Sequence, residues 1–233
     1  MYEERIIPPK KAMPQAQDGT LRKFALRVPE VFYQCSGIMV FGKRIKSLVF
    51  STDLSIIKNV NADAIIAVYP FTPQPIITQA LLLAADIPVF AGVGGGLTKG
   101  QRVVNLAMFA EMQGATGVVL NAPTANTVVQ HVAETIDIPV VVTVARADTD
   151  FDARLQAGAN IFNVSAAAET PAIVRSIRER YPDVPIIATG GPTDESILET
   201  IKAGANAITW TPPSNGEIFR DIMAAYRDNK PHP

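Results

Sequence analysis

Three segments of the chain repeat one pattern: DIPVFAGVG at 86–94, DIPVVVTVA at 137–145 and DVPIIATGG at 183–191. A second set alternates with them: NADAIIAVYP at 61–70, GATGVVLNAP at 114–123, GANIFNVSAA at 158–167 and GANAITWTPP at 204–213. Each is a continuous apolar run rich in β-branched residues, which is typical of a parallel strand buried on both faces. The segment KSLVFSTD at 46–53 adds an eighth strand at the front.

Amphipathic segments lie between these predicted strands, each with an apolar stripe opposite polar residues: 74–85, 99–113, 125–136, 170–181 and 195–203. Thr98, Thr193 and Ser214 stand where helix N-caps belong, and Gly158 and Gly204 stand at helix ends. Strand–helix alternation in four similar quarter units predicts an α/β fold, a single closed (β/α)8 TIM barrel over residues 46–233. An open doubly wound sheet is the competitor, which the even spacing and the missing nucleotide fingerprint disfavour.

Residues 1–45 form a predicted N-terminal helical and extended extension. The stretch 20–33 (TLRKFALRVPEVFY) predicts a helix that ends at Pro29 and closes the bottom of the barrel. The proline-rich stretch 6–15 predicts an extended arm, either disordered or laid across a neighbouring subunit. We therefore expect a homo-oligomer.

The composition predicts a folded protein and argues against several classes of partner. Hydrophobic residues make up 48% and charged residues 18%, enough for a large core. A net charge of −1 argues against nucleic acid and against an anionic membrane surface. The single cysteine, Cys35, excludes an intramolecular disulfide framework and predicts a buried structural thiol. No apolar run is long enough to span a membrane. We expect a cytoplasmic protein with a small-molecule substrate.

Active sites of this fold lie at the C-terminal ends of the strands. Aligning the quarter units places Asn121, Ser165 and Thr211 near the rim, with Asn163 and Thr209 two residues deeper on the same side. In the other set of strands, Thr189 is equivalent to Gly92 and Thr143. Asn163 and Thr209 interrupt runs of Val, Ile and Ala, so each must have a partner: a ligand, a neighbouring side chain or water.

Two charged residues follow strand ends. Asp53 could serve as general base or as a Mg²⁺ ligand, or it could cap the next helix. Arg146 could bind a carboxylate or phosphate bidentately, or form a salt bridge with Asp148, Asp150 or Asp152.

Two glycine-rich loops are candidate anion sites. Gly94, Gly95 and Gly96 expose backbone donors next to Lys99, and Gly190 and Gly191 directly precede a helix. The alternatives are a mobile lid at the first loop and a plain strand-to-helix turn at the second. The first loop does not fit the P-loop spacing.

Several chemistries are disfavoured. The two histidines, His131 and His232, fall in a predicted helix and in the C-terminal tail, away from the strand ends. A histidine-based zinc site or a Ser-His-Asp triad is therefore not expected. No lysine lies inside a later strand, where a Schiff-base nucleophile would sit.

The motifs ATGGP at 188–192 and GANAITW at 204–210 resemble the ribulose-phosphate-binding barrel superfamily. That resemblance implies that Gly190 and Gly191 hold a substrate phosphate. The chain departs from the pattern after the last strand, where TPPS at 211–214 replaces the expected Gly-Ser, and prolines supply no N–H. Asp194 and Glu195 in the next helix would also repel an anion. The whole chain, with AVYPFTPQP, AGVGGG and NAPT, is similar to an uncharacterised bacterial barrel family often labelled hydrolase.

Together these features predict an enzyme that acts on a small anionic, phosphorylated metabolite by acid/base chemistry, of isomerase, lyase or synthase type. Asp53, Asn121 and Asn163 are the catalytic candidates. The substrate-binding candidates are Arg146, Ser165, Thr189, Thr209 and Thr211. A hydrolase that uses Mg²⁺ is one alternative. A non-catalytic barrel that binds a metabolite or, less favoured, FMN is another.

Overall fold

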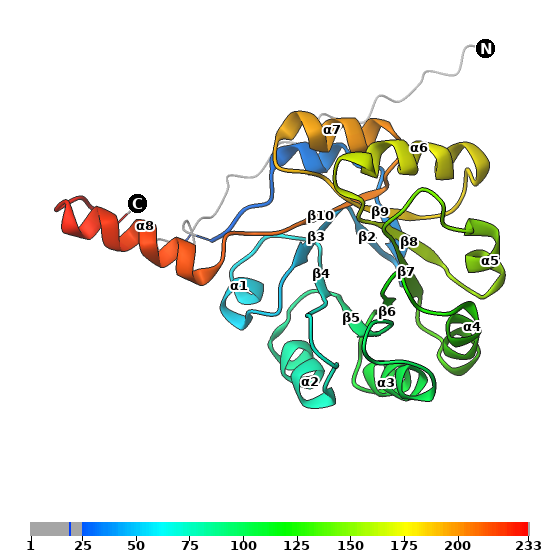
Figure 1. The fold of residues 1–233 in the computed structure, drawn as a ribbon. Helices are drawn as coiled ribbons and strands as arrows, with labels where there is room; N and C mark the ends of the chain where they lie inside the picture. Colours follow the sequence, from blue (N-terminus) through cyan, green and yellow to red (C-terminus); the bar gives the residue numbers. More distant parts are fainter. Residues whose placement is uncertain (1–18, 20–24, 233) are drawn as a thin grey trace, which may run out of the picture.

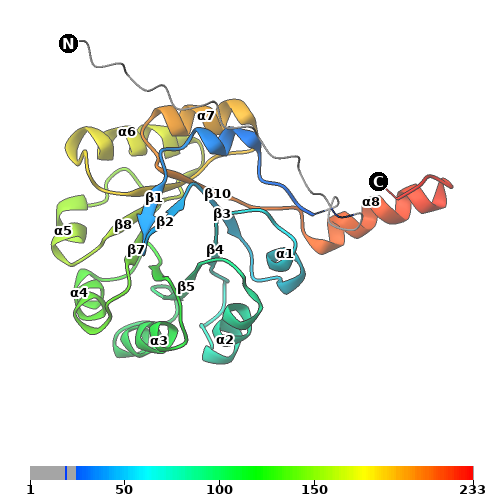
Figure 2. The same cartoon turned by 180° about the vertical axis from the view of Figure 1, so that it is seen from behind.

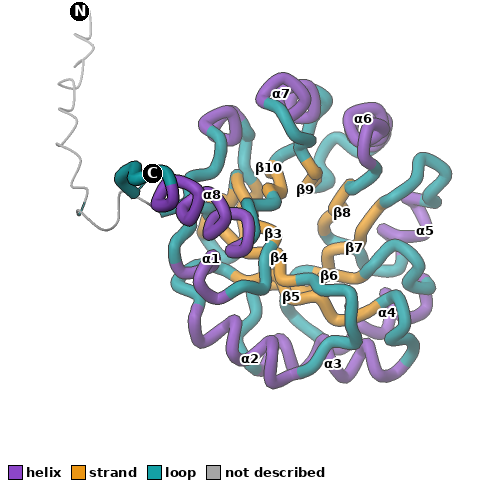
Figure 3. Tube along the Cα trace, turned by 60° about the vertical axis from the view of Figure 1, so that its left-hand side comes forward, coloured by secondary structure: helices purple, strands orange, loops and turns teal. Residues whose placement is uncertain are grey.

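The computed structural model describes residues 19 and 25–232, and an eight-stranded parallel barrel forms its centre (Figure 1). The strands pair in the closed order β10-β3-β4-β5-β6-β7-β8-β9, which confirms the predicted (β/α)8 barrel. Figure 3 shows the ring of strands inside an outer layer of helices. The strands are β3 (Ser47–Phe50), β4 (Ala64–Ala67), β5 (Val89–Gly94), β6 (Gly117–Leu120), β7 (Val140–Val144), β8 (Ile161–Val164), β9 (Ile186–Thr189) and β10 (Ala207–Trp210).

The helices follow the strands in turn: α1 (Leu54–Lys58), α2 (Pro75–Ala84), α3 (Gln101–Met112), α4 (Asn126–Thr135), α5 (Phe151–Gln156), α6 (Thr170–Arg180), α7 (Asp194–Lys202) and α8 (Asn215–Arg227), with a short 3-10 helix η3 (Ala167–Glu169) before α6. Thr193 and Ser214 cap α7 and α8 through capping boxes, as predicted. Thr98 is not a cap, because Gly100 holds the N-cap position of α3.

The sequence repeat has a shared structural role at the bottom of the barrel. Directly before β4, β8 and β10, a polar residue accepts a hydrogen bond from the first N–H of the preceding strand. Asp63 Oδ2 accepts from Ser47 at 3.0 Å, Asn160 Oδ1 from Val140 at 2.8 Å, and Asn206 Oδ1 from Ile186 at 2.9 Å. These bonds fix three strand pairs in the same register.

A hairpin closes the bottom of the barrel. Strands β1 (Ile38–Val40) and β2 (Lys43–Ile45) pair antiparallel, and Figure 2 shows them lying across the barrel axis. Ile38, Val40 and Ile45 are buried in one cluster with inward-facing side chains of the barrel, including Leu48 and Phe90. Removing this apolar area from water stabilises the closed end.

The N-terminal segment differs from the predicted helix. A 3-10 helix η2 (Glu30–Gln34) begins after Pro29 rather than ending there, because proline fits the start of a helical turn better than its interior. Leu26 pairs with Val60 beside α1, and η2 packs against α7. The chain from 26 to 35 therefore occupies the outer position between α7 and α1. The predicted extended arm and residues 20–24 lie outside the described residues.

Helix α8 leaves the ring instead of closing it. It projects from the barrel in Figures 1 and 2, and none of its residues is buried. Phe219, Met223 and Tyr226 are exposed on it. Among the described residues, no helix combines the length and apolarity needed to cross a bilayer.

Candidate functional site

A layer of polar side chains covers one half of the barrel interior near its C-terminal end. Strand alternation places Thr143, Asn163, Thr189 and Thr209 two residues above Val141, Ile161, Ile187 and Ala207, which face the inner core. Thr143 is paired in register with Asn163, and Thr189 with Thr209. Four consecutive strands thus place hydroxyl and amide groups side by side at the mouth, and we call these four residues the mouth layer. Of the predicted residues, Asn163, Thr189 and Thr209 are brought together here.

Two polar atoms of this layer have no hydrogen-bond partner among the residues that the structure describes. Asn163 Nδ2 lies 3.4 Å from Thr143 Oγ1, but Asn163 Oδ1 and Thr209 Oγ1 are buried without a partner. Rotating the amide by 180° exchanges its two polar atoms and still leaves one of them unpaired. Asn163 is 8% exposed and Thr209 9% exposed. Each unpaired buried atom costs about 1–3 kcal/mol, so both are suited to meet a bound molecule.

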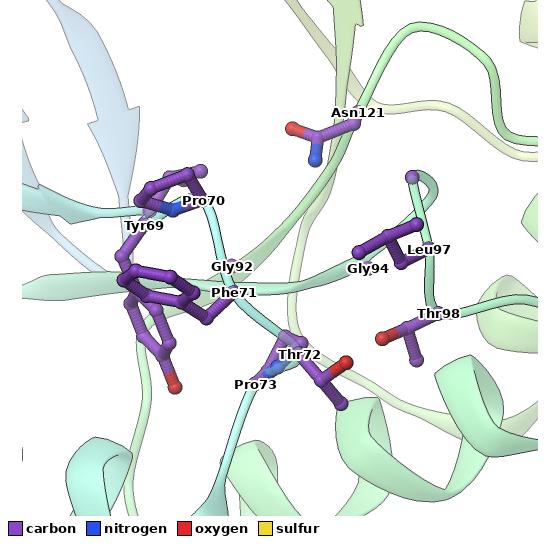
Figure 4. Close-up of a pocket in the computed structure, with 12 residues that line it drawn as sticks. Tyr69, Pro70, Phe71, Thr72, Pro73, Gly92, Gly94, Leu97, Thr98 and Asn121 are labelled. Atoms are coloured by element: carbon purple, nitrogen blue, oxygen red, sulfur yellow. The ribbon is translucent and has the colours of Figure 1, made fainter.

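A pocket of about 200 Å³ opens at the ends of β4, β5 and β6, between the β4–α2 loop, the β5–α3 loop and β6, and none of the four mouth-layer residues lines it; we call it the loop pocket (Figure 4). Its apolar wall consists of Val68, Tyr69, Pro70, Phe71, Pro73 and Leu97. Its polar groups come from Thr72, Thr98 and Asn121 and from the backbone at Gly92, Gly94 and Gly96. Figure 4 shows the Asn121 amide and the Thr98 hydroxyl both directed into the pocket.

Thr98 is the residue that sequence reasoning misplaced. Its side chain is buried, with the residue 5% exposed, and within the described part of the chain Oγ1 has no hydrogen-bond partner. A threonine shortly before a helix is the usual signal of an N-cap. The left-handed Gly100 (φ 58°) starts α3 two residues later and leaves Thr98 free to face the pocket.

The first glycine-rich loop is only partly available to an anion. The Gly95 N–H already donates to Thr98 O at 3.0 Å, and the loop packs closely on the next one, since a Cβ at Gly95 would lie 1.9 Å from Thr124 Oγ1. Gly94 and Gly96 line the loop pocket. Lys99 is exposed and is not among the lining residues.

The second glycine pair is explained by packing. A Cβ at Gly190 would lie 2.7 Å from Ile197 Cγ1 and 2.8 Å from Ile208 Cγ2, so only glycine fits between α7 and β10. Gly191 takes a left-handed φ of 87°. The hollow next to the pair is also lined by Glu199, and the capping box of Thr193 and Ser196 uses donors at the start of α7. These features favour the turn over the anion site.

Asp53 is the N-cap of α1. Oδ1 accepts from Ser55 N at 2.8 Å, Ile56 N at 3.3 Å and Ser55 Oγ at 2.7 Å, while Oδ2 accepts from Asn215 Nδ2 at 2.5 Å. These donors, the Ser55 hydroxyl above all, hold the pKa of Asp53 below its ordinary value. A low pKa makes a weak base, so the geometry favours capping and the catalytic role stays a prediction.

Arg146, Ser165 and Thr211 do not join the buried layer. The Arg146 guanidinium binds Asp148 bidentately, at 2.9 and 2.6 Å, and both side chains are exposed. This is the salt-bridge alternative for Arg146. The guanidinium is paired with Asp148 at the surface instead of facing the barrel mouth. Ser165 and Thr211 are exposed beyond the ends of β8 and β10.

The donor set does not fit a divalent metal ion. Among residues 25–232, no group of three or more His, Cys, Asp or Glu side chains comes together as a metal cluster would. The mouth layer offers amide and hydroxyl groups, and both oxygens of Asp53 are occupied by hydrogen bonds. Mg²⁺ in proteins is bound through one or two carboxylates, which this layer lacks.

No family model matches the sequence, and no curated protein matches it. Solved structures share the fold. The chain is similar to 2,3-dimethylmalate lyase, a PEP mutase/isocitrate lyase superfamily member, at 12% identity over 91% of this chain and 88% of that one (TM-score 0.61). It is similar to phosphonopyruvate hydrolase in complex with oxalate and Mg²⁺, at 13% identity over 80% and 84% of the two chains (TM-score 0.59).

A phosphoenolpyruvate phosphomutase from Streptomyces platensis subsp. rosaceus matches at 14% identity over 86% of each chain, with a TM-score of 0.60. At these identities the likeness establishes the TIM barrel. The superfamily named for the lyase is not the ribulose-phosphate-binding one that the motifs resemble, so that finer family stays a prediction.

Proposed function

We propose that the protein is an enzyme that acts on a small anionic metabolite, by isomerase or lyase chemistry, at the C-terminal mouth of the barrel. One observation carries the proposal: Asn163 Oδ1 and Thr209 Oγ1 are buried there without partners. Folding leaves such atoms unpaired at a cost, and a substrate that pairs with them recovers it. Structural neighbours that share the fold include a hydrolase and a lyase, which supports an enzyme over a binding protein.

The chemistry suited to this layer is polarisation of a substrate carbonyl. In the rotated orientation of the Asn163 amide, Thr143 Oγ1 donates to Asn163 Oδ1 and the Asn163 N–H group is the unpaired one. That N–H group and the Thr209 hydroxyl are then neutral donors, fixed on strands, that can stabilise negative charge developing on a substrate oxygen during proton transfer or bond cleavage. Asp53 remains the predicted base, but its lowered pKa makes the carboxylate a weak proton acceptor. The proposed chemistry therefore depends on Asn163 and Thr209 more than on Asp53.

The test combines binding with turnover. A thermal-shift screen of sugar phosphates, phosphorylated heterocycles and 2-oxo carboxylates, with and without Mg²⁺, identifies compounds that raise the melting temperature. Each hit is then incubated with the protein and followed by NMR. We expect conversion by the natural protein and at least a hundredfold loss in Thr209→Val and in Asn163→Leu. Equal turnover in these variants would rule out the proposed site.

A second function, binding without catalysis, is favoured by one observation. The mouth layer contains no titratable side chain, since Thr143, Asn163, Thr189 and Thr209 are all neutral. A compound that binds saturably at Thr209 but stays unchanged over days would select this function. A yellow purified protein would identify FMN as the ligand.

The hydrolase alternative requires a metal. A structural neighbour was solved with Mg²⁺, but the donor set here does not suit that ion. Turnover that persists in excess chelator would exclude metal-assisted hydrolysis.

A further inference from the structure

We propose that the loop pocket binds the carboxylate group of a small molecule with an apolar body, and that Thr98 is its hydroxyl ligand. The inference rests on the proposed function in assigning this carboxylate to the same substrate. It adds a binding residue and narrows the anion from any charged group to a carboxylate.

Thr98 provides the first argument. Its hydroxyl is buried, lacks a partner and faces the pocket from the β5–α3 loop. Asn121 faces the same space from the end of β6 (Figure 4). A hydroxyl and an amide N–H that converge on one cavity can donate to the two oxygens of one carboxylate.

The backbone adds donors. Within the described part of the chain, the N–H groups of Gly96 and Leu97 have no protein acceptor. Helix α3 starts just after this loop, and its N-cap residue Gly100 has no side chain to satisfy the first-turn N–H groups. The N-cap of this helix of 12 residues follows the pocket residue Thr98 by two positions, and the positive end of a helix favours negative charge near it.

The side chains that line the loop pocket carry no positive charge, and this indicates which type of anion the pocket suits. No Lys or Arg is among the residues that line the loop pocket, and Lys99 and Arg102 are exposed outside it. A phosphate carries more than one negative charge near neutral pH and is usually matched by a cationic side chain. Neutral donors and one helix end suit a single negative charge, which is that of a carboxylate.

The other wall of the pocket selects an apolar body. The Tyr69 hydroxyl accepts a hydrogen bond from Gln74 N at 2.8 Å, which holds the ring in place. Pro70 and Pro73 restrict the backbone of the same loop. Phe71 is 73% exposed and Leu97 88% exposed at the edge of the pocket. A ligand that covers these two side chains removes apolar surface from water.

The test uses titration calorimetry of the full chain at pH 7 with sodium acetate, isobutyrate and benzoate. Benzamide serves as the neutral counterpart of benzoate, and inorganic phosphate as the competing anion. We expect binding to strengthen from acetate to benzoate, with benzamide and phosphate at least tenfold weaker than benzoate. Thr98→Val should weaken benzoate at least tenfold, and Thr98→Ser, which keeps the hydroxyl, should stay within threefold of the natural protein. Leu97→Ala should weaken benzoate more than acetate.

Matched variants separate this site from the rest of the protein. Thr200→Val changes a buried threonine on α7 that lies outside the loop pocket, and it should bind benzoate like the natural protein. Tighter binding of phosphate than of benzoate, failure of all three carboxylates, or unchanged benzoate affinity in Thr98→Val would each overturn the proposal. Thr209→Val tests the proposed function independently: loss of turnover there, with benzoate unaffected by Thr98→Val, would leave the function intact and remove only the carboxylate pocket.

Discussion

Asn215 Nδ2 lies 2.5 Å from Asp53 Oδ2, a bond between residues 162 positions apart. It ties the first residue of α8 to the N-cap of α1, the first helix after the barrel's opening strand. The carboxylate therefore links the two ends of the ring as well as capping a helix.

Replacing Asp53 with Ala should lower the free energy of unfolding by about 1 kcal/mol, as expected for a lost N-cap. Because donors in the folded state lower its pKa, the stabilisation by Asp53 is complete above its ordinary value of 3.8 and is lost as the pH falls through the lowered value. Urea unfolding at pH 7 and pH 2.5 should show the difference between the two proteins shrink in acid. A loss of turnover without a loss of stability would instead restore Asp53 as the base.

Thr209→Val should raise the stability of the ligand-free protein by about 1 kcal/mol, because valine has the same shape and removes an unpaired hydroxyl. Thermal unfolding in the absence of ligand measures this change. Thr209→Ser is the control, since it keeps the hydroxyl and loses only a methyl group. A destabilised valine variant would mean that the hydroxyl has a partner, such as ordered water.

Gly190→Ala should destabilise the protein by about 1–3 kcal/mol, because the added methyl group meets Ile197 and Ile208 in a packed core. Gly96→Ala is the matched change, since a Cβ there meets nothing within 4 Å, and its stability should stay within about 0.5 kcal/mol. Chemical denaturation compares the two. Equal stability for both variants would contradict the packing role of Gly190.

Cys35 should resist alkylation in the folded protein. Burial raises its pKa from 9.0 to about 11, so almost no thiolate forms at pH 8. The same shift makes stability fall between pH 9 and 11, because the unfolded thiol ionises there while the folded one stays protonated. Iodoacetamide labelling followed by mass spectrometry checks the first point, with urea-unfolded protein as the positive control. Rapid labelling of the native chain would show that the thiol is accessible.

Helix α8 is where the predicted homo-oligomer is most readily tested. It buries none of its own residues, and Phe219 and Met223 are 63% and 43% exposed. We expect Phe219→Ser with Met223→Ser to lower the mass measured by light scattering while the circular dichroism spectrum is preserved. Exchange of two exposed charges on the same helix, Arg220→Glu with Asp221→Arg, provides a comparison. A natural protein that is already monomeric at 100 µM would contradict the oligomer prediction.

The barrel could be predicted because its signal is local and repeated. Buried parallel strands need long apolar runs, and four similar quarters leave few other ways to pair them. The hairpin was not predicted; its sequence signal is limited to Phe41-Gly42, a two-residue turn in which both φ angles are positive, between Val40 and Lys43, which pair across it.

The site could be predicted less well than the fold, because each of its sequence patterns fits more than one structural role. An aspartate after a strand serves equally as cap or base, and only the bond to Asn215 reveals how fully it is used. Thr98 was misassigned because one glycine shifts the start of α3 by two residues. Asn163 and Thr209 could be found because a polar side chain inside an apolar strand is costly to bury unless something pairs with it.

The β1–β2 hairpin fills the far end of the barrel with packed side chains, so the interior has no through passage. In the proposed enzyme, substrate and product would both pass through the C-terminal end of the barrel, where Phe71 and Leu97 are exposed beside the loop pocket. A compound that fills this end would therefore hinder the entry of substrate and the release of product alike.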